Sequence, residues 1–167
     1  REDGAVIQLK SPREIDTMAE GGRILAATLA MLRDSVRAGM TTLEVDRLAE
    51  DFIRSHDGAI PAFKGQYGFT GSVCISVNHE IVHGIPTKKR VLVDGDIVSL
   101  DVGVKYAGLF TDSAVTVAVG GISAEDQRLL DVTRTALEAG IAAALPGNHV
   151  GDIGHAVQSV VERAGFS

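Results

Sequence analysis

Two strand-length runs joined by a short connection constrain the fold of this chain more than any other part of its sequence. The runs lie within SLDVGVKYAGLFTDSAVT, residues 99–116, and are rich in valine, threonine and other residues that favour strands. This pattern predicts a β-hairpin. Each predicted strand carries one aspartate, Asp101 and Asp112, in otherwise apolar or small surroundings.

The two aspartates are predicted to face each other if the connection consists of the four residues 105–108. Val104 would then pair with Leu109, and Asp101 would lie directly opposite Asp112 on one face of the hairpin. Side chains in such positions have Cβ atoms about 4.5–5.5 Å apart, so two carboxylates there repel unless one keeps a proton or a cation lies between them. Hard oxygen ligands without nearby thiolates favour a divalent metal ion.

Two alternatives to this metal site remain open. A connection of two or three residues would shift the strand partners. One aspartate could also be a turn or cap residue while the other is solvated. Even where both bind metal, two aspartates do not complete a dinuclear hydrolytic site, which takes further carboxylates and often an imidazole.

The sequence before these strands is typical of helices. Ser11 is followed by a proline and then by Glu14, which predicts an N-cap with a capping box, and Gly39 is the expected C′ stop of this first helix. Thr41 and Glu44 predict a second capping box, for a helix that ends near residue 58.

Between residues 59 and 121 the composition changes: valine, isoleucine, glycine and threonine dominate, in runs of strand length. SVCISV (72–77) and EIVHGI (80–85) are predicted as further strands. Two more helices are predicted beyond this region, from Ser123 to about residue 145 and from about residue 150 to 164.

The two helix pairs indicate an internal duplication. AGMTTLEVDRLAEDFI (38–53) and PGNHVGDIGHAVQSVV (146–161) align without gaps. The alternative is that any two amphipathic helices after a glycine cap look alike. Under duplication the chain is a single domain, in which residues 11–121 form a first helix-and-strand half and residues 123–167 open a second half whose strands are missing.

One histidine stands out by its position. His83, in IVHGIP at the end of a predicted strand, is placed for substrate hydrogen bonding or proton transfer. The alternative role is that of a structural histidine with satisfied hydrogen bonds. The other four histidines show no metal-ligand spacing. Cys74 lies within a strand pattern without a basic neighbour, which is not the setting of a nucleophilic cysteine.

Composition excludes several classes of function. Hydrophobic residues make up 45% of the chain and the net charge is −6, which predicts a packed core and offers no basic surface for nucleic acid or anionic lipid. No run approaches 18 apolar residues, and the first ten residues lack a signal-peptide core, so neither a membrane span nor secretion is expected. A single cysteine fits a reducing cytoplasm.

Four segments, taken in order, carry a family resemblance: SVCISVNHEIVHGIP, LVDGDIVSLDVGV, AGLFTDSAVTVAVG and PGNHVGDIGHAV. Together they resemble the type I methionine aminopeptidases of the pita-bread metallopeptidase superfamily. The resemblance implies an α+β pita-bread fold, in which a curved antiparallel sheet with flanking helices closes over a dinuclear metal centre, with the second pseudo-symmetric half incomplete in this chain. The implied reaction removes the initiator methionine from nascent polypeptides whose second residue is small.

The resemblance also implies roles for individual residues. Asp101 and Asp112 correspond to metal ligands, and His83 corresponds to the catalytic histidine that hydrogen-bonds the scissile peptide. A pocket for the substrate's methionine side chain is implied as well, lined by Phe63, Phe69 and Cys74. A soft thioether suits a small apolar pocket with a sulfur and aromatic edges.

The implied cofactors are two divalent metal ions, and cobalt, manganese, iron and zinc all suit oxygen and imidazole ligands. The family's metal-binding histidine, in a His-Gly-x-Gly motif, and its two glutamate ligands would lie beyond Ser167, so the 167 residues alone are expected to be inactive. The expected partners are nascent polypeptide N-termini, with the ribosome as a candidate place of contact, and not nucleic acid or membrane. Two alternatives are an Xaa-Pro aminopeptidase or prolidase relative and a non-catalytic pita-bread module that binds a peptide or protein.

Overall fold

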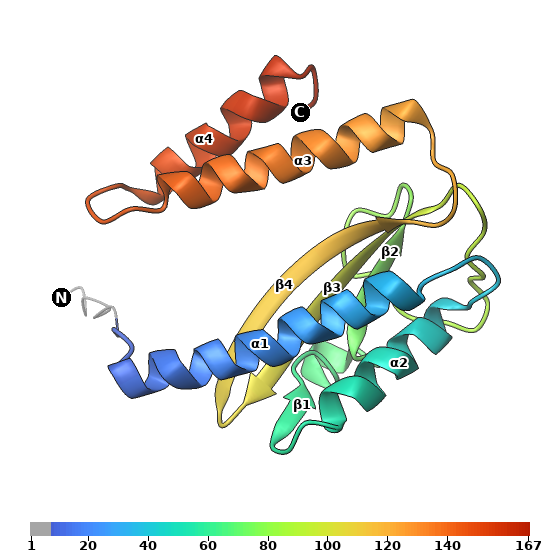
Figure 1. Cartoon of the computed structure of the whole chain (residues 1–167), viewed down its shortest axis with the longest axis horizontal. Coiled ribbons are helices and arrows are strands. Elements are labelled where there is room, and N and C mark those ends of the chain that lie inside the picture. The colour runs from blue at the N-terminus through green and yellow to red at the C-terminus, as the bar shows by residue number, and fades with distance from the viewer. Residues whose placement is uncertain (1–7) are drawn as a thin grey trace. The chain divides into compact units, whose positions relative to one another are not determined.

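The computed structural model describes residues 8–167. Residues 1–7 lie outside the described residues. The prediction that the first ten residues lack a signal-peptide core falls largely on them. By its contacts the chain divides into two compact units, one ending at Gly121 and one beginning at Ile122, and each is described by itself. The elements along the chain, shown in Figure 1, are α1 (Pro12–Ser35), α2 (Thr42–Arg54), β1 (Ala59–Pro61), the short 3₁₀ turn η1 (Gln66–Gly68), β2 (Val73–Val77), β3 (Ile97–Tyr106), β4 (Leu109–Ala118), α3 (Ala124–Ala143) and α4 (Val150–Arg163).

Capping boxes begin the first two helices, as the sequence predicted. Ser11 Oγ accepts a hydrogen bond from the Glu14 N–H at 3.3 Å, while the Glu14 carboxylate accepts one from the Ser11 N–H at 2.7 Å. Thr41 and Glu44 repeat this arrangement at α2, with distances of 3.2 and 2.7 Å. Each box satisfies N–H groups that have no partner within the helix.

The predicted helix stop at Gly39 is wrong. α1 ends at Ser35, and Val36 already leaves the helix in an extended conformation. Gly39 lies in the connection to α2 with a φ of 89°, and its N–H donates to the Leu92 carbonyl at 2.8 Å. This left-handed glycine therefore shapes the connection between the two helices and does not end the first one.

Four antiparallel strands form the sheet of the first unit, with β3 at its centre. β4 pairs with the whole length of β3 along one edge. β2 and β1 pair with successive parts of the other edge of β3. β2, β3 and β4 confirm the strands predicted around Cys74, Asp101 and Asp112.

The alternation of side chains gives this sheet two different faces. One face is apolar, and α1 and α2 pack over the sheet on this side (Figure 1). The core there is fully buried and includes Val98, Leu100, Val102 and Val104 of β3 with Leu32, Val45 and Ile53 of the helices. Burial of each such side chain contributes about 1.5–3 kcal/mol. The opposite face carries the polar and small residues of β3.

A two-residue turn, not a four-residue loop, joins β3 and β4. Ala107 and Gly108 occupy the turn with φ of 46° and 85°, and Tyr106 pairs with Leu109. Positive φ at both positions belongs to the two-residue turn whose twist suits antiparallel strands. The predicted loop of residues 105–108 is therefore wrong, and the strand register moves by two residues.

The predicted strand at residues 80–85 is also wrong. β2 ends at Val77, and Asn78 turns the chain with a φ of 57°. The segment then leaves the sheet instead of extending it, so that Ile81 and Val82 are 89% and 63% exposed.

In the second unit, α3 packs against α4. A Cβ at Gly140 of α3 would lie 2.9 Å from Cγ2 of Val157 of α4, so glycine permits this close approach. Gly147 precedes α4 with a φ of 93°, just as Gly39 precedes α2 with a φ of 89°. This equivalence supports the duplicated helix pair, and the division into two structural halves stays a prediction. None of the described helices combines the length and apolar character needed to cross a bilayer.

Candidate active site

The polar face of the sheet brings three of the predicted site residues together. Cys74 of β2 pairs directly with Asp101 of β3, and Asp112 of β4 pairs with Gly103 of β3. Direct partners point to the same face, and so do residues two apart on one strand. Cys74, Asp101 and Asp112 therefore share one face, opposite the apolar core.

The two carboxylates are diagonal neighbours and not direct partners. Asp101 pairs with Ala114, and Asp112 lies two residues before Ala114 on β4. The prediction that the two aspartates lie directly opposite each other is wrong, because the two-residue turn moves the register. A shift by two keeps both side chains on the same face, and diagonal neighbours remain within reach of each other.

Asp101 lies in surroundings that disfavour its negative charge. Burial raises its pKa to about 6, the charge of Asp112 and a hydrogen bond with the Asp112 side chain add to the rise, and His83 opposes it. Within the described residues, the buried oxygen Oδ1 of Asp101 has no hydrogen-bond partner. A buried oxygen without a partner is costly, so this position calls for a proton or a cation.

The two carboxylates are of a kind that suits a divalent cation, and they would supply part of the coordination that one needs. Carboxylate oxygens are the hard ligands that divalent metals prefer, and the unsatisfied Oδ1 of Asp101 is such a ligand. Within residues 8–167, no group of three or more histidine, cysteine, aspartate or glutamate side chains is placed to hold a metal ion. The described chain therefore offers an incomplete set of ligands.

Cys74 remains a thiol at neutral pH. The residue is 7% exposed, and burial raises the pKa of its thiol to about 11, with further rises from the charges of Asp101, Asp112 and Asp46. A protonated thiol is not a nucleophile. The Cys74 thiol therefore presents a small, polarizable surface beside Asp101.

The ring of Phe63 lies over Gly103. A Cβ at Gly103 would come within 2.5 Å of Cε1 of Phe63. Gly103 is the direct partner of Asp112, so the ring stands on the face of the sheet that carries the carboxylates. Phe63 and Phe69 both lie in the loop of residues 62–72, which joins β1 to β2. The Phe69 N–H donates to the Gln66 carbonyl at 2.8 Å. The ring of Phe69 is half-buried, and its place in a substrate pocket stays a prediction.

His83 occupies a left-handed turn with a φ of 59° and does not end a strand. The next residue, Gly84, is attached to β2: the Ile75 N–H donates to the Gly84 carbonyl at 2.9 Å, and the Gly84 N–H donates to Ser76 Oγ at 3.1 Å. A Cβ at Gly84 would collide with the Ile75 carbonyl oxygen. This attachment fixes the backbone beside the exposed imidazole of His83. The charge of His83 lowers the pKa of Asp101, against the larger effect of burial.

Sequence reasoning missed Ser76, Gly84 and Gly103. Both glycines are visible in HGIP and LDVGV, but only the close approach of a second backbone or a ring reveals what they permit. Ser76 is 4% exposed and sits in an apolar strand pattern, which gave no signal of its contact with Gly84.

A surface hollow of about 400 Å³ lies within the second unit, on α3 and α4. Its lining includes Gln127, Arg128, Asp131 and Val160, and it contains none of the predicted site residues. The chemistry of the candidate site belongs to the polar face of the sheet and not to this hollow.

Comparison with known proteins identifies the relatives of this chain. The family model described as metallopeptidase family M24 matches residues 16–167. The chain is 49% identical over 162 residues to methionine aminopeptidase 1 of Bacillus subtilis (strain 168), and the match covers 97% of this chain. The chain spans 64% of the length of that relative.

Solved structures show the same likeness. The crystal structure of methionine aminopeptidase from Thermotoga maritima matches with a TM-score of 0.92 at 40% identity, over 96% of this chain and 64% of that one. Prolidase from Pyrococcus furiosus matches with a TM-score of 0.84 at 19% identity, over 94% of this chain and 44% of that one, which is a likeness of fold alone. The α+β pita-bread fold and the resemblance to methionine aminopeptidases are therefore confirmed. The chain belongs to metallopeptidase family M24.

Proposed function

We propose that this chain forms part of a metal-dependent methionine aminopeptidase, which removes the initiator methionine from nascent polypeptides whose second residue is small. The observation that carries the proposal is the buried, unsatisfied oxygen of Asp101 on the sheet face that also holds Asp112 and Cys74. The 49% identity to a protein named methionine aminopeptidase 1 supports this substrate over others in the family.

Asp101 and Asp112 would hold two divalent ions, and cobalt, manganese, iron or zinc would suit their oxygens. When bound, such ions polarise a carbonyl and activate water for hydrolysis. The two carboxylates would offset part of the charge of the ions, and a cation would favour the ionised form of Asp101, which burial and the charge of Asp112 disfavour. Since the described residues supply few ligands, the 167 residues alone should bind metal weakly and turn over peptide negligibly.

The other predicted residues would bind and orient the substrate. Phe63, Phe69 and the Cys74 thiol offer apolar and polarizable surface for the methionine side chain, which favours a thioether over a charged side chain. The imidazole of His83, on a backbone fixed to β2, would hydrogen-bond the scissile peptide and keep it in register with the carboxylates. Nascent polypeptide N-termini in the cytoplasm would be the partners, with the ribosome as the place of contact.

Two other functions are weaker candidates. An Xaa-Pro aminopeptidase or prolidase is supported only by likeness of fold, at 19% identity to the Pyrococcus furiosus prolidase. A non-catalytic peptide-binding module would have no use for Asp101, a carboxylate whose charge is disfavoured by burial and by the neighbouring Asp112.

The test measures release of the first residue from Met-Ala-Ser and from Ala-Pro peptides with added manganese or cobalt. It compares the 167-residue chain with a longer polypeptide that continues through the full length of its relatives. We expect methionine release by the longer polypeptide only, and its loss in an Asp112→Asn variant. Release of the residue before proline would favour the prolidase alternative, and a folded, metal-loaded polypeptide that cleaves neither peptide would favour the binding module.

A further inference from the structure

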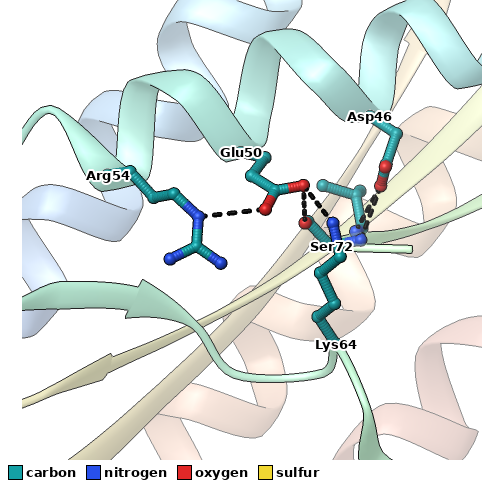
Figure 2. A network of polar contacts seen from close by, with 6 residues as sticks. Asp46, Glu50, Arg54, Lys64 and Ser72 are labelled. Atoms are coloured by element: carbon teal, nitrogen blue, oxygen red, sulfur yellow. Dashed lines mark hydrogen bonds and ion pairs between the residues drawn. The ribbon is translucent and has the colours of Figure 1, made fainter. Parts of the chain in front are cut away.

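Glu50 of α2 is the centre of a polar network beside the loop of residues 62–72 (Figure 2). Its carboxylate accepts hydrogen bonds from Lys64 Nζ at 2.5 Å, Arg54 Nε at 2.9 Å and Ser72 Oγ at 3.0 Å. The Glu50 side chain is 17% exposed. The hydrogen bond from Lys64, helped by those from Arg54 and Ser72, lowers the pKa of Glu50 to about 2 against the opposing effect of burial. Glu50 is therefore ionised across the neutral pH range.

Asp46, one turn earlier on α2, holds the far end of the same loop. Its Oδ1 accepts hydrogen bonds from the Ser72 N–H at 2.7 Å and the Val73 N–H at 2.9 Å (Figure 2). Asp46 is 3% exposed, and burial raises its pKa although the two backbone hydrogen bonds oppose the rise. The start of β2 is thus attached to α2 through a buried carboxyl group.

The loop between these attachments consists of turns. Gly65, Tyr67 and Gly68 all have positive φ, and Tyr67 is fully exposed. Internal hydrogen bonds join the Gly65 N–H to the Phe69 carbonyl at 2.9 Å and the Phe69 N–H to the Gln66 carbonyl at 2.8 Å. Internal hydrogen bonds of this kind give the segment its own shape, so its attachments to the rest of the unit determine where it stands. At its first end the Ala62 N–H donates to the Gly103 carbonyl at 2.9 Å, and Lys64 and Ser72 bind α2.

We propose that Glu50 and Lys64 are positioning residues that determine where Phe63 and Phe69 stand in the proposed methionine pocket. Lys64 follows Phe63 directly, and its ammonium is bound to α2 while the Phe63 ring lies over Gly103. Release of Lys64 removes the attachment to α2 that lies between the two rings in the chain. The hydrogen bond from the Ala62 N–H to the Gly103 carbonyl remains, and Asp46 still holds the start of β2. That the ligand is a methionine side chain rests on the proposed function, but the attachment of the loop to α2 through Lys64 and Glu50 does not.

The effect of this ion pair is local. The Lys64 side chain is 43% exposed, so solvent screens its charge and the pair contributes little to the stability of the whole unit. A variant that loses the pair should therefore remain folded. Any change in its hydrogen exchange or KM then comes from the loop and not from unfolding of the whole unit.

The test compares Lys64→Met with Arg54→Met. Both substitutions remove one cation from Glu50, but only the first releases the loop, so Arg54→Met is the matched control. Hydrogen exchange of residues 62–72 is measured in the 167-residue chain. KM and kcat for Met-Ala-Ser are measured in the longer polypeptide that releases methionine. Lys64→Arg tests whether a different cation at position 64 keeps the attachment. Glu50→Gln removes the negative charge but keeps the size and shape of the side chain.

We expect Lys64→Met and Glu50→Gln to speed hydrogen exchange in residues 62–72 about tenfold and to raise KM about tenfold, with kcat changed by less than about twofold. Arg54→Met should change neither quantity, and Lys64→Arg should restore both. The selectivity for Met-Ala-Ser over Leu-Ala-Ser should fall in Lys64→Met, because displaced rings no longer fit the thioether.

Three results would overturn the proposal: unchanged exchange in Lys64→Met, faster exchange with an unchanged KM, or equal effects of Lys64→Met and Arg54→Met. The second and third would leave the pair with a structural role only. If no preparation releases methionine, the proposed function fails, and hydrogen exchange alone then decides whether Lys64 holds the loop.

Discussion

The ring of Phe63 lies over Gly103 so closely that a Cβ at Gly103 would come within 2.5 Å of the ring. Gly103 is also the direct strand partner of Asp112. One position without a side chain therefore brings an apolar ring and a carboxylate to the same face of the sheet. The proposed site needs both, because it must bind an apolar side chain next to metal-binding oxygens.

Gly103→Ala should overpack this contact. We expect it to lower the free energy of unfolding by about 1–3 kcal/mol, as measured by urea denaturation. Phe63→Leu in the same chain should recover part of the loss, since the shorter side chain leaves room for the added methyl group. An equal cost of Gly103→Ala with phenylalanine and with leucine at position 63 would show that the ring does not lie there.

Gly84→Ala should displace the backbone next to His83. The added Cβ would collide with the Ile75 carbonyl oxygen, and we expect a loss of about 2 kcal/mol or more in the free energy of unfolding. The matched control is Gly22→Ala in α1, where a Cβ meets no atom within 4 Å. That variant should gain about 0.5–1 kcal/mol, because glycine weakens a helix interior. Equal effects of the two substitutions would contradict the close attachment of Gly84 to β2.

Much of this fold follows from local sequence signals. The helix starts at Ser11 and Thr41 were predictable because a capping box is formed by residues three apart. The hairpin was predictable from its composition, but its register was not. Ala107 adopts a φ of 46° in the turn, and alanine is not among the residues that mark such turns.

The features missed in the sequence depend on contacts between distant residues. Asp46 holds the N–H of Ser72, 26 residues away, and Glu50 holds Lys64, 14 residues away. No periodicity or spacing reports such pairs. The apolar run around His83 was mistaken for a strand because Asn78, which turns the chain out of the sheet, lies before the run and gives only a weak signal.

Asp101 should make the stability of the metal-free chain depend on pH. Its pKa is about 6 in the folded chain against an ordinary value of 3.8, so the folded state holds more protons between these values. The free energy of unfolding should therefore fall as pH rises from about 4 to about 6, and stay lower above that range. In EDTA, Asp101→Asn should be more stable than wild type near pH 7.5, by about 1 kcal/mol after allowance for partial exposure, and not near pH 4.

Urea denaturation at both pH values checks this prediction. The control is Asp16→Asn, which changes an exposed aspartate on α1. If wild type and Asp101→Asn show the same pH dependence, the carboxylate of Asp101 is not disfavoured in the folded chain.

Cys74 should react slowly with thiol reagents. Because its thiol has a pKa of about 11 and lies 7% exposed, alkylation near pH 7 should be at least about a hundredfold slower than that of free cysteine, and should quicken as pH rises toward about 10. The chain has one cysteine, so the mass of the intact protein reports this single reaction directly. Rapid alkylation at neutral pH would show that the thiol faces solvent, and Cys74 would not then line a pocket.

Strand pairing places Asp101 and Asp112 on one face of the sheet, and the proposed function requires that a divalent cation binds between them. This binding can be measured by titration of the 167-residue chain with manganese, followed by the electron paramagnetic resonance of free Mn²⁺. We expect weak binding, with a Kd on the order of 0.1–1 mM from two carboxylates alone. This binding should be lost in both Asp101→Asn and Asp112→Asn and kept in Asp16→Asn. Binding that survives in either of the first two variants, or no binding to wild type at 10 mM manganese, would contradict it.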